Sequence, residues 1–353
     1  MQKTVLIDFE RLKYPNTGLF HFCCHLGKNL THLATKQDKL FFYLPKSMEG
    51  CFGRNVNYIR QRSFHKYYSP CISNFDVWHA AQQGTQYFPY KSSQKKILTI
   101  HDINFMHDGS KSAEKKKRYL SDLEKKIRHS DSIVAISNYV MNDVSKYIDI
   151  PEKKKNIIYN GCNIEDQKEL HLPKIKVEGS FLYTIGVITA KKNFHVLPPL
   201  LRDNNMKLVI SGMTDNTGYK QKIIEEAKKF KVEKRIIFTG AVSENDKQWY
   251  FANCTAFLFP SLAEGFGLPV IEAMYFGKPV ILSNLTSLPE IGGDAAYYFN
   301  NFEPENMVHI LKSSLVSFQN NQPENLIKQR AQSFNWRDTA QKYLSLYDSV
   351  LCT

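Results

Sequence analysis

The chain has 353 residues and a mass of 40.9 kDa, which is more than one domain usually holds and indicates two. Hydrophobic residues make up 42% of it and charged residues 23%, which predicts well-filled cores and excludes a disordered, collagen-like or coiled-coil chain. The net charge is +13, and residues 1–175 carry most of it, with 28 Lys and Arg against 17 Asp and Glu.

The beginning of the chain and its cysteines bear on the cellular compartment. MQKTVLIDFE enters a strand-like segment at once, without the apolar stretch of a signal peptide, and no apolar run approaches the length of a membrane span. The seven cysteines are scattered and contain no C-x-x-C, which argues against a disulfide framework or a zinc site. We therefore expect a cytoplasmic protein.

Short apolar runs rich in β-branched and aromatic residues alternate with amphipathic helical stretches along nearly the whole chain. In the first half these runs are TVLIDF, KLFFYL, DVWHA, KKILTIHD, SIVAIS and NIIYNG. In the second half they are SFLYTIG, MKLVISG, RIIFTG, TAFLFPS, KPVILSN and AAYYF. Such runs, each leading through a turn into a helix, are typical of parallel strands with crossover helices. The sequence therefore predicts the α/β class.

The polar stretch 166–179 separates the two halves and predicts the domain boundary. We place one domain at 1–170 and a second at 171–335. The amphipathic stretch 336–353 is expected to form a C-terminal helix that packs back across the N-terminal domain.

The densest charge lies in residues 111–128, KSAEKKKRYLSDLEKKIR, which predict a helix. Its narrow apolar stripe consists of Ala113, Tyr119, Leu120, Leu123 and Ile127. The charged face is either merely solvated or touches an anionic surface. A lipid surface is favoured over nucleic acid, since no nucleic-acid-binding signature accompanies the charge.

In open parallel sheets, ligands bind beyond the carboxyl ends of the strands, so the loops there carry the chemistry. Three such loops stand out, namely HDINF at 101–105, GVITAKKN at 186–193 and AEGFGLPVIEA at 263–273. In the first, His101 with Asp102 is either a functional or a hydrogen-bonded structural residue. In the second, Lys192 is either a phosphate ligand or half of a solvated pair with Lys191.

The third loop predicts an anion site. Its glycines precede a helix that Pro269 suits at its start, and the N-terminus of such a helix presents free N–H groups to phosphate. Glu264 stands before the helix and Glu272 is placed in its first turn, where carboxylates can accept hydrogen bonds from sugar or ribose hydroxyls. The alternative is that Glu272 only stabilises the helix dipole and that the glycines only make a turn.

The stretch Gly265-x-Gly267-x-x-Val270 is close to the dinucleotide-binding fingerprint and raises the possibility of a dehydrogenase. That fingerprint belongs after the first strand of a domain, followed by an acidic residue at the end of the next strand. Here it follows a late strand, and the next one ends in Ser283 and Asn284. A nicotinamide enzyme is therefore disfavoured.

Glu264 and Glu272 reproduce an E-x7-E spacing within FPSLAEGFGLPVIEAMYFGKPVI, which resembles the donor-site signature of retaining GT-B glycosyltransferases, above all family 4. GVITAKKN resembles the family's G-R-x-x-x-x-K-N loop, and TIHDINF resembles its His-bearing loop. VAISNYV and YNGCN are similar to its segments near the interdomain crossing, and NTGLFHFCCHLGKNL is similar to its N-terminal glycine loop and helix.

This resemblance implies the GT-B architecture, with two facing Rossmann-like domains, parallel sheets and an interdomain cleft. The N-terminal domain would bind the acceptor and the C-terminal domain the nucleotide sugar. Glu264 would hold donor-sugar hydroxyls, Lys192 the diphosphate, and His101 the sugar from the opposite domain, and these are the candidate catalytic residues. The candidate donor-binding residues are Glu272 at the ribose, the backbone of Gly265, Phe266, Gly267 and Leu268, Val242 near the base, Gly186, and Gly18, which is otherwise a simple turn.

The implied activity is retaining, metal-independent transfer of a hexose to a glycan or lipid-linked glycan acceptor in surface polysaccharide biosynthesis. Most members have Arg where this chain has Val187, a departure shared by mannosyltransferase-like members, so GDP-mannose is favoured as donor and a UDP-sugar stays possible. No cofactor or metal is expected, because no D-x-D stands at a strand end.

The expected partners are the donor, the acceptor and an anionic membrane surface, with no nucleic acid. The enzyme would be peripheral at the inner face of the plasma membrane. The alternatives are a nucleotide-sugar epimerase of GT-B fold and a non-catalytic basic scaffold that binds membranes.

Overall fold

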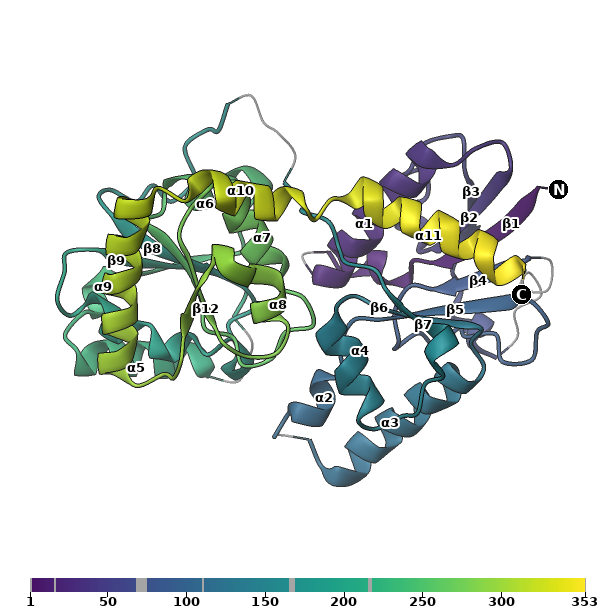
Figure 1. The fold of residues 1–353 in the computed structure, drawn as a ribbon, viewed down its shortest axis with the longest axis horizontal. Coiled ribbons are helices and arrows are strands. Elements are labelled where there is room, and N and C mark those ends of the chain that lie inside the picture. The colour runs from purple at the N-terminus through teal and green to yellow at the C-terminus, as the bar shows by residue number, and fades with distance from the viewer. Residues whose placement is uncertain are drawn as a thin grey trace. The chain divides into compact units, whose positions relative to one another are not determined.

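The computed structural model describes residues 2–15, 17–67, 75–109, 111–164, 169–214 and 218–352. The chain forms two compact units (Figure 1). The first unit comprises Met1–Asn163 and Phe334–Thr353, and the second comprises Ile164–Ser333. The division falls just before the stretch 166–179 that we predicted as the boundary, of which 166–168 lie outside the described residues.

The first unit is built on a seven-stranded sheet in the order β3-β2-β1-β4-β5-β6-β7. All of its pairings are parallel. Its strands are β1 (Lys3–Asp8), β2 (Asp38–Leu44), β3 (Asn57–Arg60), β4 (Val77–Ala80), β5 (Lys95–Ile100), β6 (Ser132–Ala135) and β7 (Lys155–Ile157). Each of the six apolar runs predicted for this half contains a strand. The edge strand β3 was missed, because only two of its four residues are apolar and none is fully buried.

In the described part of this unit, five α-helices accompany the sheet, with α1 and α11 on one side and α2, α3 and α4 on the other (Figure 1). They are α1 (Gly18–Leu33), α2 (Asn104–His107), α3 (Ala113–Arg128), α4 (Asn138–Ser145) and α11 (Trp336–Leu351). Two tyrosines of α11 bond to the sheet, with the Tyr343 hydroxyl 2.9 Å from the Thr99 hydroxyl and the Tyr347 hydroxyl 2.8 Å from His79 Nδ1. The C-terminal helix is therefore part of the core of the first unit.

The basic helix α3 differs from its prediction on the buried side. Leu123 and Ile127 are buried as expected, but Ala113 is exposed and Lys126 is only 2% exposed. Lys126 Nζ pairs with Asp122 at 2.5 Å and donates to the Gln83 carbonyl at 2.9 Å. A buried ammonium is tolerated only with such partners, so this lysine is not part of the charged face.

The second unit is built on a six-stranded parallel sheet in the order β10-β9-β8-β11-β12-β13. Its strands are β8 (Phe181–Ile185), β9 (Lys207–Ser211), β10 (Ile236–Gly240), β11 (Ala256–Phe259), β12 (Val280–Ser283) and β13 (Tyr297–Phe299). Its helices are α5 (Tyr219–Lys229), α6 (Glu244–Asn253), α7 (Leu268–Tyr275), α8 (Leu288–Gly292), α9 (Pro304–Asn321) and α10 (Glu324–Gln332). α5 and α9 pack on the turn Pro198–Leu201, whereas α6, α8 and α10 pack on α7.

Both sheets follow the doubly wound strand order, in which strands are added on one side of the first strand and then, from the fourth strand on, on its other side. We call the boundary between the first and fourth strands of each unit the reversal point. The predicted α/β class with parallel sheets and surrounding helices is confirmed. The reversal point lies between β1 and β4 in the first unit and between β8 and β11 in the second, and the loops that follow these strands are where a ligand is expected.

Within the described ranges, no helix has both the length and the apolar composition needed to span a bilayer. The same residues contain no cluster of three or more His, Cys, Asp or Glu side chains arranged to hold a metal ion.

Candidate functional site

Two loops of the second unit meet at its reversal point. One follows β8 and runs over residues 186–193, and the other follows β11 and runs over residues 260–267. Leu262 N donates to the Lys191 carbonyl at 2.8 Å, and Ser261 Oγ lies 3.3 Å from the same carbonyl oxygen. These bonds hold the two loops together, although 70 residues separate them in sequence.

The candidate residues Lys192 and Glu264 form an ion pair across these loops, with Lys192 Nζ 2.6 Å from Glu264 Oε1. Ser261 Oγ donates to the same carboxylate oxygen at 2.5 Å. Lys192 Nζ also lies 4.6 Å from the centre of the Phe259 ring, which adds a cation–π contact. The two charged side chains are only 13% and 12% exposed, so little water screens their attraction.

Both groups of this pair have shifted pKa values. Burial raises the pKa of the Glu264 carboxyl, but the Lys192 ammonium and the Ser261 hydroxyl outweigh it, and the pKa lies below its ordinary value. Burial lowers the pKa of Lys192, and the Glu264 carboxylate offsets only part of this effect. Glu264 is therefore a carboxylate at neutral pH and can accept hydrogen bonds.

Glycines make room for this pair. Gly186 has a φ of +152°, and a Cβ there would lie 2.9 Å from Lys192 Cε, so a side chain at this position would displace the lysine. A Cβ on Gly212 would lie 1.9 Å from the Gly186 carbonyl oxygen. The close approach of these backbone segments therefore requires glycine at position 212, and the positive φ of Gly186 favours glycine there as well.

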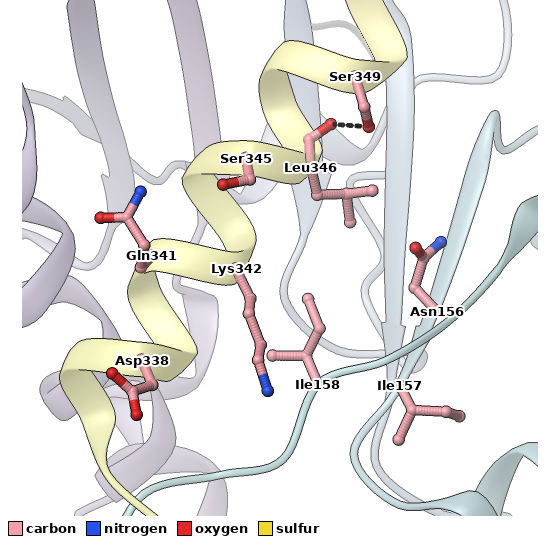
Figure 2. Close-up of a pocket in the computed structure, with 9 residues that line it drawn as sticks. All are labelled: Asn156, Ile157, Ile158, Asp338, Gln341, Lys342, Ser345, Leu346 and Ser349. Carbon is pink, nitrogen blue, oxygen red and sulfur yellow. Dashed lines mark hydrogen bonds between the residues drawn. The ribbon is translucent and has the colours of Figure 1, made fainter.

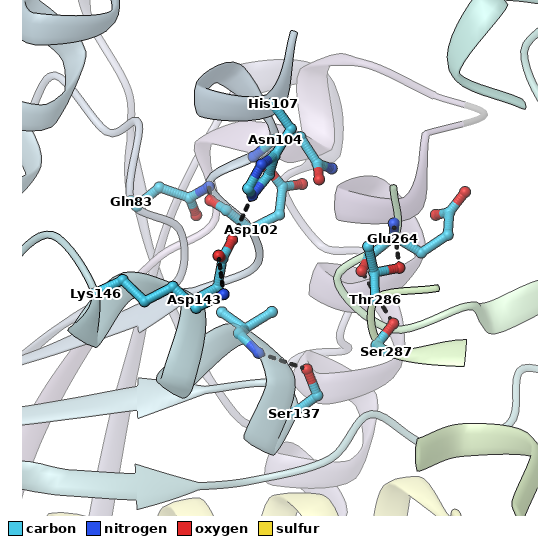
Figure 3. Close-up of polar contacts among 11 residues, drawn as sticks. Gln83, Asp102, Asn104, His107, Ser137, Asp143, Lys146, Glu264, Thr286 and Ser287 are labelled. Atoms are coloured by element: carbon cyan, nitrogen blue, oxygen red, sulfur yellow. Dashed lines mark hydrogen bonds and ion pairs between the residues drawn. The ribbon is translucent and has the colours of Figure 1, made fainter. Parts of the chain in front are cut away.

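The loop before α7 is fixed by residues that follow β12. Glu264 N donates to Thr286 Oγ1 at 3.1 Å (Figure 3). Ser287 Oγ is 3.0 Å from both the Glu264 and the Phe266 carbonyls. Gly267, with a φ of +108°, caps α7, and Leu268 begins it. Phe266 is buried as a whole residue, with only 4% of its surface exposed.

Glu272 lies elsewhere than predicted. It is the fifth residue of α7, in the second turn rather than the first, where the helix dipole has little effect on it. Its Oε1 is 3.1 Å from Lys247 Nζ of α6, and both side chains are nearly buried. Lys247 also pairs with Glu244 at 2.8 Å. Val242, the residue expected near the base, follows β10 and is half-buried.

In the first unit, His101 follows β5 and is 8% exposed. Its Nε2 is 2.9 Å from the Ala81 carbonyl oxygen and therefore carries a proton and donates. Burial lowers the pKa of His101 to about 4, so the ring is neutral at pH 7. A neutral ring whose one proton is engaged in this way can accept a hydrogen bond through Nδ1.

The loop after His101 is held by neighbouring side chains (Figure 3). Gln83 accepts from His101 N at 3.1 Å and donates to the Asp102 carbonyl at 2.8 Å. His107 Nε2 lies 2.7 Å from the buried carboxylate of Asp143, which also pairs with Lys146 at 3.2 Å. The loop that carries His101 is therefore anchored on both sides.

Gly18 is the first residue of α1, after Thr17, whose hydroxyl accepts from Phe20 N at 3.2 Å. A Cβ on Gly18 would meet nothing within 4 Å. Asn16, which precedes it in the predicted glycine loop, lies outside the described residues.

Four residues that shape the site were missed from the sequence: Ser261, Lys247, Phe259 and Ser287. Ser261 had a usable signal, since it stands three residues before Glu264 in the same loop. Lys247 had none, because α6 has no marked apolar periodicity and nothing in the sequence marks this lysine as a buried one.

Comparisons with known proteins identify relatives of this chain. The family described as "Glycosyl transferases group 1" matches residues 166–332, and the family described as "Glycosyltransferase Family 4" matches residues 43–166. The chain is 22% identical to "O-antigen chain mannosyltransferase B" of Escherichia coli, over 97% of this chain and 99% of that protein.

Solved structures show the same fold. Sucrose-phosphate synthase from Thermosynechococcus elongatus matches with a TM-score of 0.77 and 14% identity, over 99% of each chain. Anabaena Alr3699/HepE, solved in complex with UDP and glucose, matches with a TM-score of 0.73 and 15% identity, over 98% of this chain and 100% of that one. Both the strand order and these neighbours assign the GT-B fold.

We expect Glu272→Gln to lower the melting temperature, because it removes a buried charge partner of Lys247 at a cost of roughly 1–3 kcal/mol. The matched control is Glu244→Gln, which removes the other partner of the same lysine. The side chain of Glu244 is 53% exposed, so its loss should cost about 1 kcal/mol or less. Thermal unfolding of both variants tests this, and an equal or smaller loss for Glu272→Gln would contradict a structural role of the buried pair.

Proposed function

Because this chain belongs to glycosyltransferase family 4, we propose that it transfers a hexose, with mannose favoured, from a nucleotide-diphosphate sugar to a glycan or lipid-linked glycan acceptor. The pathway would be surface polysaccharide biosynthesis. The similarity to an O-antigen mannosyltransferase along nearly the whole chain supports the sugar and the pathway.

The observation that carries the proposal is the Lys192–Glu264 pair beside the N-terminus of α7. When a sugar leaves a nucleoside diphosphate, negative charge grows on the departing phosphate oxygen. A lysine and the positive end of a helix dipole are suited to stabilise that charge. The carboxylate next to them suits the hydroxyls of the sugar being transferred.

The carboxylate of Glu264 can bind the sugar while it remains paired with Lys192. Within the described part of the chain, its contacts with Lys192 and Ser261 both use Oε1. Oε2 then accepts from a donor-sugar hydroxyl, since a carboxylate has about four acceptor sites. Lys192 Nζ has three protons, so it can hold Glu264 and a phosphate oxygen together.

We propose transfer with retention by displacement on one face of the sugar. The bond from the anomeric carbon to the diphosphate oxygen breaks, and the bond to the acceptor oxygen forms on the same face. The acceptor proton passes to the leaving phosphate. Glu264, the carboxylate at this site, is held by Lys192 and Ser261, which suits binding of hydroxyls more than attack on carbon.

Val187 occupies the position where most family members have Arg, and it is 46% exposed. One cation for the diphosphate is therefore missing from this loop, and Lys192 would neutralise more of the diphosphate charge. This departure and the mannosyltransferase relative both favour GDP-mannose as donor.

The excess of basic residues in the first half supports attachment to the anionic inner face of the plasma membrane, where a lipid-linked acceptor would be found. A nucleotide-sugar epimerase of the same fold would bind a donor without an acceptor. A basic scaffold would bind membranes without a nucleotide.

A thermal-shift comparison of GDP, UDP and ADP tests the donor class, because a ligand that binds only the folded protein raises the melting temperature. We expect GDP to give the largest shift. At a concentration 100 times its Kd, a nucleotide stabilises by about 2.7 kcal/mol, which is readily measured. No shift with any nucleotide would contradict the proposed function, and a larger shift with UDP would contradict GDP-mannose as donor.

Lys192→Ala should lower kcat by about 10²-fold or more, because the lost contact strengthens as the phosphate leaves. The matched control is Lys191→Ala, which removes the neighbouring exposed lysine and should leave kcat within a few-fold. Steady-state kinetics with varied donor measure both. A loss confined to KM, or an equal loss for the two variants, would argue against a role at the leaving group.

We also propose that transfer needs no divalent metal, since Lys192 and the N-terminus of α7 supply the positive charge. Activity measured after treatment with EDTA should therefore equal that of the untreated enzyme. Loss of activity with EDTA and its recovery with Mg²⁺ or Mn²⁺ would overturn this account of the leaving group.

A further inference from the structure

Two adjoining hollows lie on the first unit between its edge strand β7 and the C-terminal helix α11. The first, of about 540 Å³, is lined by Asn156, Ile157, Ile158, Asp338, Gln341, Lys342, Ser345, Leu346 and Ser349 (Figure 2). The second, of about 450 Å³, is lined by Lys95, Asp131, Ser132, Lys153, Lys154, Asn156, Leu346, Ser349 and Val350. Because they share three residues, we treat them as one feature, the α11 groove.

The α11 groove lies away from the reversal point of its sheet. Lys95 and Ser132 are the first residues of β5 and β6, so the second hollow is at the amino ends of these strands. The first hollow reaches Ile157, the last residue of β7, and Ile158 after it. His101 follows the other end of β5, about 20 Å away at 3.3 Å per residue. The second hollow is therefore separate from the loop that carries His101.

One end of the α11 groove is basic. Lys95, Lys153 and Lys154 line it with a single carboxylate, Asp131, whose Oδ1 is 3.7 Å from Lys95 Nζ. Lys153 is exposed and, within the described residues, forms no ion pair. Lys154 Nζ donates one proton to the Ser130 carbonyl at 2.7 Å and retains two others. This end is suited to a phosphate group.

The other end combines an apolar wall with one more cation, Lys342, and one carboxylate, Asp338. Ile157 and Ile158 form one side, Leu346 of α11 faces them, and Lys342 reaches over from the helix (Figure 2). Ser345 and Ser349 lie one turn apart on the same helix face, where their small side chains leave space. The lining includes no aromatic residue on which a nucleobase could stack.

We propose that the α11 groove binds an anionic phospholipid, with the phosphate at Lys95, Lys153 and Lys154 and an acyl chain along Ile157, Ile158 and Leu346. A basic end joined to an apolar end matches the chemistry of such a lipid better than that of a nucleotide or a free phosphate. The inference rests on the membrane attachment proposed above and assigns it to this groove rather than to the basic face of α3.

Sedimentation with phosphatidylcholine vesicles, with and without phosphatidylglycerol, tests the lysines at both ends of the groove. The double variant Lys153→Glu/Lys342→Glu should bind the anionic vesicles about tenfold or more weakly than the parent protein. The matched control is Lys115→Glu/Lys117→Glu on α3, which makes the same change of charge at exposed positions of the same unit. This control variant should lose clearly less of its binding to the anionic vesicles. Equal losses of vesicle binding by the two double variants would mean diffuse electrostatic attraction and would overturn the proposed lipid site. Equal binding of the parent protein to neutral and anionic vesicles would overturn it as well.

Ser349→Phe tests the apolar half by filling the groove without changing charge. The matched control is Ser313→Phe on α9, another exposed helical serine. The two hydroxyls make equivalent bonds, from Ser349 to the Leu346 carbonyl at 3.0 Å and from Ser313 to the Ile310 carbonyl at 3.1 Å. Ser349→Phe should weaken vesicle binding several-fold and Ser313→Phe should not. Unchanged binding by Ser349→Phe, with melting temperatures preserved, would contradict an acyl-chain site.

The test of the groove is distinct from the test of glycosyl transfer. If the nucleotides give no thermal shift on the parent protein but the groove variants lose vesicle binding, the proposed enzyme activity fails and the lipid site stands. If the nucleotides bind and the groove variants keep vesicle binding, the lipid site fails alone.

Discussion

The ion pair between Lys192 and Glu264 is the constraint on which the candidate site depends. Removing two charges from water is costly, and only close contact with further hydrogen bonds offsets that cost. Here the compensation comes from Ser261, from the Phe259 ring and from the bonds between the two loops. The loops cannot separate without exposing an unpaired charge, so the site is held in shape before any donor arrives, and binding of the donor need not order it.

The strand order determines where the Lys192–Glu264 pair lies. In a doubly wound sheet the crossover helices diverge on either side of the first and fourth strands, and the loops that follow those strands border the resulting crevice. Lys192 follows β8 and Glu264 follows β11, the two central strands of the second unit. The basic hollow of the α11 groove, by contrast, is lined by Lys95 and Ser132 and lies at the amino ends of β5 and β6 in the first unit. The candidate site and the basic hollow therefore lie at opposite ends of the strands, in two sheets of related strand order.

Much of the fold could be predicted from the sequence, because buried parallel strands are continuous apolar runs and each was followed by a turn. The failures have physical causes. β3 is a half-exposed edge strand with a weak pattern. Lys126 and Lys247 are buried through partners distant in sequence, which composition does not reveal. Glu272 was placed one turn too early, because α7 begins at Leu268. Lys192 and Glu264 were both named from their loops, but their contact depends on which strands are neighbours. Their catalytic roles stay predictions.

The central claim is that Lys192 passes from its contact with Glu264 alone to a contact that includes the donor diphosphate. A crystal structure of the protein with intact GDP-mannose is the most direct measurement. The account predicts Lys192 Nζ within hydrogen-bond distance of a diphosphate oxygen, and Glu264 Oε2 accepting from a hydroxyl of the sugar. A diphosphate bound elsewhere, with the pair unchanged and out of reach of the donor, would contradict it.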